Sequence, residues 1–256
     1  MGYGMIILEK KETIGILTLN RPEKSNTLSS AFLNEIIQGL REIDDDEDVR
    51  VIVIQSQGKH FCAGADISES RPTTVSRQRD KRFAKLAAAV HSLKKPVIAA
   101  VHGAATAGGC GLALACDLVI ASEDARFGLT GINVGLFCFG PAVPLSRTLG
   151  WKKALELLLT GDIIPAGQAL GLGMINRVVP RESLEKEVME LAGKLARKSP
   201  LALQMGKEGF YALAEMPYRQ ALDCSESLIA ILSSTEDAEE GIRAFLEKRE
   251  ARWKKC

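Results

Sequence analysis

A loop of small residues after an apolar run constrains this chain more than any other feature. The run at 96–101 leads into His-Gly-Ala-Ala-Thr-Ala-Gly-Gly at 102–109, and apolar helical character follows from about Gly109 to Cys116. A strand that passes through glycines into a helix leaves backbone N–H groups unpaired where negative charge is stabilised. Gly108 and Gly109 also let a ligand approach the backbone. Two interpretations stay open: a tight turn of an α/β core, or a site for an anion or oxyanion.

Composition limits the classes of partner and compartment. A chain of 256 residues suits one large domain, or one domain with a small appendage. A net charge of +1 gives no global field, so we expect neither nucleic acid nor a membrane as a partner. The six cysteines form no C-x-x-C pair and the three histidines lack metal-ligand spacing, so we expect no metal site and a reducing compartment. Because the chain enters a strand pattern almost at once, we expect a cytoplasmic protein.

Periodicity divides the chain into an alternating first half and a helical second half. β-rich segments recur between helical ones, with small-residue loops after strands, and this pattern predicts an α/β fold. The expected strands are 5–10, 13–20, 50–55, 97–101, 117–122 and 175–179. The expected later helices are 151–159, 165–170, 182–197, 200–213, 218–232 and 235–248. This helical part could cover the α/β core or a partner subunit.

Two local signals predict helix starts. Thr27 or Ser29 can cap a helix whose apolar residues, from Phe32 to Ile43, fall on one face. Ser-Thr-Glu-Asp at 234–237 approximates a capping box before the last helix.

Six short stretches, in order and at matching spacing, resemble the crotonase (enoyl-CoA hydratase/isomerase) superfamily over almost the whole chain. They are Asn20–Leu28, Phe61–Ile67, Val101–Ala113, Ala125–Gly128, Leu159–Asp162 and Glu240–Arg249. The run Gly-Ile-Asn-Val-Gly-Leu-Phe-Cys at 131–138 resembles the subgroup of enoyl-CoA-hydratase-domain-containing protein 3.

The resemblance implies a fold, a ligand and an assembly. The fold would be a ClpP-like α/β spiral of ββα units over 1–195, followed by a helical oligomerisation region over 196–256. The assembly would be a homotrimer or a dimer of trimers. The ligand would be an acyl-CoA thioester, with coenzyme A as part of the substrate and no tightly bound cofactor. The activity would belong to the lyases or isomerases of fatty acid metabolism.

The same resemblance implies site residues. Two backbone N–H groups, those of Ala63 and Gly108, would form an oxyanion hole for the thioester carbonyl, and the second also begins the helix noted above. Coenzyme A would contact two loops and the last helix, where the helix residues would mainly meet coenzyme A of a neighbouring subunit. The implied contacts are Lys24, Ser25, Ala65, Asp66, Ile67, Phe245 and Lys248. For Lys248, a solvated basic tail is the alternative.

The sequence departs from the family at the two positions that carry the hydratase glutamates. These positions match Gly111 and Gly131. Hydration needs two carboxylates, because water must lose a proton while the α-carbon gains one. Glycine has no proton acceptor. We therefore expect inefficient hydration.

Several groups could replace the missing carboxylates. Thr130-Gly131 resembles dihydroxynaphthoyl-CoA synthases, some of which use a bound bicarbonate as base, although the further slots here are Leu136 and Cys138. Cys138 could be an acid or nucleophile, but a buried small apolar residue is the stronger interpretation. His60 and His102 flank the loops and could be bases, with a structural role favoured for His102.

Two polar residues have structural alternatives of their own. Asn133 could bind an acyl group or cap a turn, and Asp117 is expected to be structural.

These expectations leave three functions open. The first is an acyl-CoA enzyme that uses the oxyanion hole without the glutamate pair, as in decarboxylation, thioester hydrolysis or a double-bond shift. The second is a non-catalytic acyl-CoA-binding protein or regulator. The third is ordinary enoyl-CoA hydration, which the two glycines disfavour.

Overall fold

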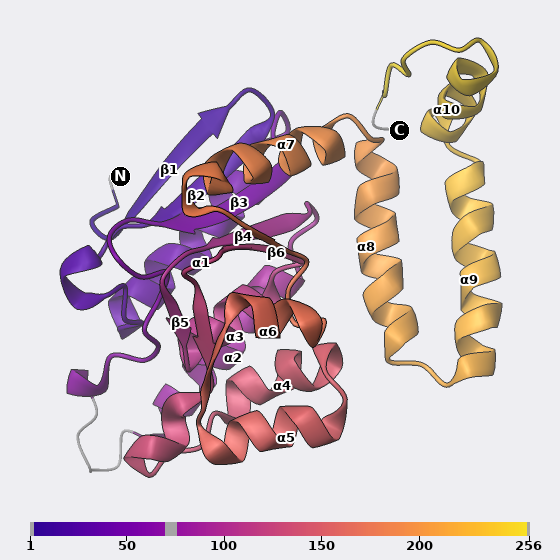
Figure 1. The fold of residues 1–256 in the computed structure, drawn as a ribbon. Coiled ribbons are helices and arrows are strands. Elements are labelled where there is room, and N and C mark those ends of the chain that lie inside the picture. Colours follow the sequence, from indigo (N-terminus) through magenta and orange to yellow (C-terminus); the bar gives the residue numbers. More distant parts are fainter. Residues whose placement is uncertain (1–2, 70–75, 255–256) are drawn as a thin grey trace.

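A six-stranded sheet forms the centre of the molecule (Figure 1). In this computed structural model residues 3–69 and 76–254 are described, with side chains from Phe83 onward in the second range. The strand order is β1-β2-β3-β4-β6-β9, and all neighbours are parallel except the antiparallel pair β1–β2. The strands are β1 (Ile6–Lys11), β2 (Ile14–Leu19), β3 (Val51–Ser56), β4 (Val97–Val101), β6 (Leu118–Ser122) and β9 (Arg177–Val179).

A second sheet of three short strands extends from the carboxyl end of β4. Its order is β5-β7-β8, with β5 parallel to β7 and β8 antiparallel to it. The strands are β5 (Ala104–Thr106), β7 (Arg126–Gly128) and β8 (Ile163–Pro165). The sequence predicted none of the three, because each has three residues and carries no period that distinguishes it from a loop.

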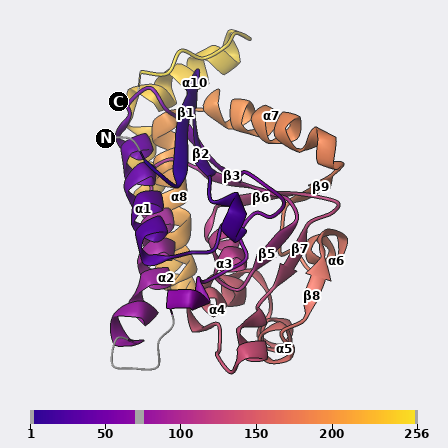
Figure 2. The same ribbon diagram turned by 90° about the vertical axis from the view of Figure 1, so that its left-hand side faces the viewer.

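Helices cover both faces of the large sheet (Figure 2). On one face α1 (Ser30–Asp45) buries Phe32, Ile36 and Leu40, and α2 (Ser76–His91) and α3 (Gly108–Ala115) belong to the same layer. On the other face α7 (Leu184–Ala196) packs Val188 and Ala192 against β2, β3 and β4. Because both faces are covered, β2 is buried along its whole length, whereas β1 is an edge strand, as the sequence predicted.

The remaining helices form two groups. Beside the small sheet lie α4 (Phe139–Thr148), α5 (Trp151–Thr160) and α6 (Ala166–Gly171). The C-terminal group is α8 (Pro200–Ala214), α9 (Tyr218–Ser233) and α10 (Glu236–Leu246), and α8 with α9 forms a hairpin that projects from the body (Figure 1). The five C-terminal helices α6 to α10 lie within two residues of the predicted boundaries. Helix α4 was not predicted, because Gly140, Pro141 and Pro144 disfavour a helix.

One half-buried carboxylate fixes the hairpin to the body. Asp117, at the start of β6, accepts hydrogen bonds from the Val97 N–H at 2.7 Å and the Tyr211 hydroxyl at 2.7 Å. The Lys207 ammonium lies 2.9 Å from the same carboxylate and is almost fully buried. Asp117 therefore has the structural role predicted for it. Among the described residues no helix is both long and apolar enough to cross a membrane.

Candidate functional site

Three chain segments meet at the end of β4 and hold one another through backbone hydrogen bonds. The Cys62 N–H donates to the Ala104 carbonyl at 3.1 Å, and the Thr106 N–H donates to the Cys62 carbonyl at 3.0 Å. On the other side of the 61–67 loop, the Leu28 N–H donates to the Gly64 carbonyl at 2.7 Å. The two glycine-containing loops that the sequence singled out therefore lie side by side.

The first backbone donor of the site is the Gly108 N–H. Gly108 is the first residue of α3, and its N–H group has no hydrogen-bond acceptor among the described residues. The preceding residue, Ala107, has φ 45° and ψ −115°, which a residue with a Cβ rarely adopts. The Ala107 N–H donates to the Gly128 carbonyl at 2.7 Å, so β7 holds this strained residue in place. The strain turns the start of α3 toward the neighbouring loop.

The second donor is Ala65, which corrects the prediction of Ala63. The Ala63 N–H already donates to the Ser25 carbonyl at 3.0 Å, so this group is not available to a ligand. The Ala65 N–H has no acceptor in the described part of the chain, and its nitrogen lies 3.7 Å from where a Cβ on Gly108 would stand. Ala65 and Gly108 are therefore the pair of free donors. Sequence alone could not separate Ala63 from Ala65, because the choice depends on the bridge between Leu28 and Ala65.

Gly64 sets the close approach of the two donors. It has φ +97°, and a Cβ there would stand 2.9 Å from the Ala107 Cβ and 3.3 Å from the Gly108 nitrogen. A side chain at this position would both strain the backbone and separate the loops.

The space beside Gly111 is occupied by an aromatic ring. A Cβ built on Gly111 would overlap the Phe83 ring and would stand 2.8 Å from its Cε2 and 2.9 Å from the Pro141 Cβ. Phe83 comes from α2. A carboxylate side chain at position 111 has no room while this ring stays in place.

The space beside Gly131 is occupied by the Cys138 thiol. A Cβ on Gly131 would stand 2.9 Å from the Cys138 Sγ. Gly131 belongs to the 3-10 helix at Thr130–Val134, and Cys138 is the N-cap residue of α4. Gly111 and Gly131 are thus each matched by a side chain from another segment.

The thiols near the site are buried and protonated at neutral pH. Burial raises the pKa of Cys110 to about 12 and raises the pKa of Cys138, although a hydrogen bond to the Gly131 backbone opposes part of the second shift. The two thiols influence each other electrostatically, which places Cys138 close to α3. A thiol with a raised pKa is a poor nucleophile and a poor base.

The predicted coenzyme A contacts from the first loops lie on the two segments that pair through Leu28 and Ala65. Lys24 and Ile67 are exposed, and Ile67 retains 65% of its accessible surface. Ser25 adopts φ 51°, and its carbonyl accepts the hydrogen bond from the Ala63 N–H. Asp66 is bound by Arg21 at 2.9 Å and by the Ser68 hydroxyl at 2.6 Å, and the Ser68 and Arg21 hydrogen bonds hold its pKa below the usual range. Its carboxylate therefore fixes the loop.

Two other predicted contacts lie on the C-terminal helical group. Phe245 in α10 is 82% exposed, and Lys248 follows the end of that helix with φ 54°. Figure 1 places α10 at the far side of the hairpin from α3. The structure does not bring these two residues to the donors of their own chain.

Both candidate histidine bases are engaged in structural hydrogen bonds. The His60 Nδ1 accepts from the Ala104 N–H at 3.1 Å. The His102 Nε2 lies 2.9 Å from the Gly58 carbonyl, and burial lowers the pKa of this ring, so it is neutral at pH 7. Asn133 contacts the Gly161 loop, with its Nδ2 3.4 Å from the Gly161 carbonyl, which fits a turn-stabilising role.

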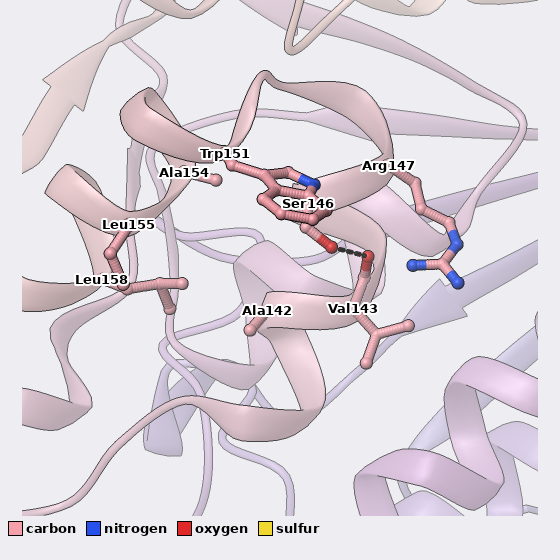
Figure 3. A pocket seen from close by; sticks show the side chains of 8 residues that line it. All are labelled: Ala142, Val143, Ser146, Arg147, Trp151, Ala154, Leu155 and Leu158. Carbon is pink, nitrogen blue, oxygen red and sulfur yellow. Dashed lines mark hydrogen bonds between the residues drawn. The ribbon is translucent and has the colours of Figure 1, made fainter.

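An apolar groove of about 400 Å³ lies between α4 and α5, apart from these residues (Figure 3). Ala154 and Leu158 form its buried floor, and Trp151 and Val143 form its exposed rim. None of the predicted site residues lines it. In the part of the chain whose side chains are described, no group of three or more His, Cys, Asp or Glu residues could hold a metal ion.

Comparison with known proteins assigns this arrangement to a family. Residues 9–256 match the family described as enoyl-CoA hydratase/isomerase. A probable enoyl-CoA hydratase of Mycobacterium tuberculosis is 37% identical over 250 residues, which cover 97% of this chain and 97% of that protein. The 2,3-dehydroadipyl-CoA hydratase of Escherichia coli is 37% identical over 245 residues, which cover 95% and 96% of the two chains.

Solved structures of enoyl-CoA hydratases and related proteins have the same fold as this chain. The enoyl-CoA hydratase of Mycobacterium smegmatis superposes with a TM-score of 0.94 at 40% identity and covers 98% of this chain and 99% of its own. Human enoyl-CoA hydratase domain-containing protein 3 gives a TM-score of 0.92 at 35% identity, with 98% and 100% covered. The α/β fold with a helical C-terminal region is thereby confirmed. The chain belongs to the enoyl-CoA hydratase/isomerase family, the crotonase superfamily.

Proposed function

We propose that this protein binds acyl-CoA thioesters and stabilises an enolate-like thioester oxygen, but does not hydrate enoyl-CoA efficiently. One observation carries the proposal: the N–H groups of Ala65 and Gly108 lie on neighbouring loops and have no acceptor in the described part of the chain. It is joined by the glycines at 111 and 131, the positions that the family resemblance matches to the hydratase carboxylates. The family supplies the ligand class, since relatives are named as hydratases of CoA thioesters.

The two donors suit a developing negative charge. The N–H groups of Ala65 and Gly108 are fixed by the backbone, and Gly108 also begins a helix, whose dipole favours an anion. Preorganised donors need no rearrangement as charge forms, and one such donor contributes about 3–4 kcal/mol to the transition state in comparable sites.

Hydration lacks its proton acceptor at this site. Cys138 lies beside Gly131, but its raised pKa keeps the thiol protonated, so it cannot accept a proton from water at pH 7. His102 is buried, and the hydrogen bond from its Nε2 to the Gly58 carbonyl fits a structural role. A base would have to come from a bound anion or from the substrate.

Decarboxylation of a malonyl-type thioester needs no protein base. The bond between the α-carbon and the carboxylate breaks, carbon dioxide leaves, and the electron pair moves onto the thioester oxygen held by Ala65 and Gly108. Water then supplies the proton to the α-carbon. The alternative is a non-catalytic acyl-CoA-binding protein, which the same donors and the same missing carboxylates also support.

The C-terminal helices complete the proposed site from another copy of the chain. Phe245 and Lys248 lie away from their own donors, so we assign them to coenzyme A held by a neighbouring subunit of a homotrimer or dimer of trimers. We place the protein in the cytoplasm, because all five cysteines that the structure describes are free thiols, which suits a reducing compartment.

Two measurements test the proposal. Calorimetric titration with a saturated acyl-CoA should show binding, with free coenzyme A as the comparison that isolates the acyl contribution. Incubation with a panel of thioesters that includes malonyl-type acids, followed by mass spectrometry, identifies any product. A folded protein that gives neither heat nor a thermal shift with any thioester would overturn the proposal.

A further inference from the structure

The Phe83 ring is held between two helices that carry glycines where they face it. A Cβ on Gly140 would stand 2.5 Å from the Phe83 Cδ1, and a Cβ on Gly111 would overlap the ring outright. Gly111 is in α3 and Gly140 is in α4, so two separate elements leave room for one side chain from α2. The Pro141 Cβ lies against the same space beside Gly111.

This ring lies against α3 close to one helical turn beyond Gly108. Gly108 and Gly111 are three residues apart in α3, so they share a face and are separated by a rise of about 4.5 Å along the helix. The neighbouring Gly109 faces elsewhere, because a Cβ there would overlap the Cys62 carbonyl. When a thioester oxygen accepts a hydrogen bond from the Gly108 N–H, Gly111 and the Phe83 ring therefore form the adjacent part of the wall that the acyl group meets.

We propose that Phe83 sets the depth of the acyl pocket and restricts the site to short acyl groups. This inference rests on the proposed function and names its substrate class. The rigid ring fills the volume that a carboxylate at position 111 would need, and the same volume is what a longer acyl chain would enter. One side chain thus excludes both the hydratase base and the extended acyl group.

Acyl-chain profiles test the inference. Dissociation constants for acetyl-, butyryl-, hexanoyl- and octanoyl-CoA are measured by calorimetry for the native chain and Phe83→Ala. We expect affinity of the native chain to stay level or fall beyond butyryl-CoA. In Phe83→Ala it should rise about three- to fourfold per added methylene until the new space is filled. Acetyl-CoA should bind both proteins within about twofold.

Leu86→Ala is the matched control, because Leu86 is fully buried on the same helix and is not part of the site. It should keep the native profile. If the native chain and Phe83→Ala are both folded and both bind acetyl-CoA, identical dependence of their dissociation constants on acyl-chain length would overturn this inference but not the proposed function. Failure of the folded native chain to bind any thioester would overturn the proposed function and the inference with it.

A stability cycle checks the contact without a ligand. Gly111→Ala should lower Tm by about 2–12 °C in the native background, since its Cβ overlaps the ring. In the Phe83→Ala background the loss should be smaller, because only the 2.9 Å approach to the Pro141 Cβ remains. Gly109→Ala should lower Tm in both backgrounds, because its Cβ meets the Cys62 carbonyl instead. An equal loss for Gly111→Ala in both backgrounds would show that Phe83 does not fill this space.

Discussion

Single residues decide whether the two backbone donors can act together. Gly64 and Ala107 hold positive φ values of 97° and 45°, and the strain at Ala107 is maintained by its bond to β7. Such strain costs roughly 1–3 kcal/mol and persists only where the surrounding structure imposes it. Here the result is that the Ala65 nitrogen lies 3.7 Å from where a Cβ on Gly108 would stand, so the two N–H groups lie on adjacent loops.

Gly108→Ala should block that space without unfolding the chain. The new methyl would stand 3.7 Å from the Ala65 nitrogen and 3.2 Å from the Leu28 Cδ1, so only a small shift of Leu28 is needed. We expect acyl-CoA affinity to fall at least about tenfold, because the methyl occupies the position of the thioester oxygen.

The matched control is Gly167→Ala in α6, where a Cβ meets nothing within 4 Å. It should leave affinity unchanged and stabilise the chain by up to about 1 kcal/mol. Calorimetric titration and urea unfolding measure both effects. Unchanged affinity in Gly108→Ala would remove this donor from the site.

Cys138 should react slowly with alkylating reagents at neutral pH. Burial raises the pKa of its thiol, and the thiolate is the reactive form, so the rate should rise about tenfold per pH unit from pH 7 to 9 without a plateau. Peptide mass spectrometry after iodoacetamide treatment measures the rate. A plateau below pH 8 would reveal a thiolate and would restore Cys138 as a candidate nucleophile.

At the scale of elements, features that depend on neighbouring residues could be predicted from the sequence, whereas contacts between elements could not. The Ser29 side chain accepts from the Phe32 N–H at 3.2 Å, as expected for the first helix start. The last helix also begins near the predicted box, but its N-cap is Thr235, which accepts from the Ala238 N–H at 3.2 Å, one residue later than the Ser234 cap that the box at 234–237 implies. Capping depends on residues within one turn, so sequence reveals it.

Contacts between segments far apart in the sequence could not be predicted, for a physical reason. Phe83 meets Gly111 and Gly140 only after α2, α3 and α4 have packed together, and no local period marks such a contact. Likewise, the choice of Ala65 over Ala63 depends on pairing with the Ser25–Leu28 segment. The family resemblance located the loops, while the identity of the free donor required the hydrogen bonds.

Asp117→Asn should destabilise the attachment of α8 to the body. The change keeps the side-chain volume but leaves the Lys207 ammonium, which is 7% exposed, without its carboxylate. Removing one partner of a buried ion pair costs about 3–5 kcal/mol, and urea unfolding measures the loss.

Glu156→Gln provides the comparison for that change. Its partner Lys153 lies 2.8 Å away, but both side chains are at least one third exposed. The free energy of unfolding should change by no more than about 1 kcal/mol. Equal losses in the two variants would mean that burial does not strengthen the contact of Asp117 with Lys207.

At the scale of the whole molecule, the hairpin presents apolar side chains that this chain does not cover. Tyr218, Leu222 and Ile229 lie at spacings of four and seven along α9, and they are 83%, 50% and 59% exposed. Apolar surface gathered on one face marks an interaction site. It supports the assembly proposed above, in which the last helices reach a neighbouring subunit.

Light scattering after size exclusion should give the mass of three or six chains. Combining Leu222→Asp with Ile229→Asp should lower that mass, because two charges would enter the proposed contact. Lys186→Glu, on an exposed side of α7, is the control and should leave the mass unchanged. A native protein that elutes as a single chain at micromolar concentration would contradict the assembly.

Hydration of crotonyl-CoA by the unmodified chain tests most directly the proposal that both proton-transferring carboxylates are absent. Crotonyl-CoA is incubated with purified protein at stoichiometric and catalytic ratios, and the 3-hydroxy product is quantified by mass spectrometry. We expect product formation no faster than in buffer, because neither Gly111 nor Gly131 can accept or supply a proton. Turnover at an ordinary enzyme rate, about 1–10³ per second, would contradict this expectation.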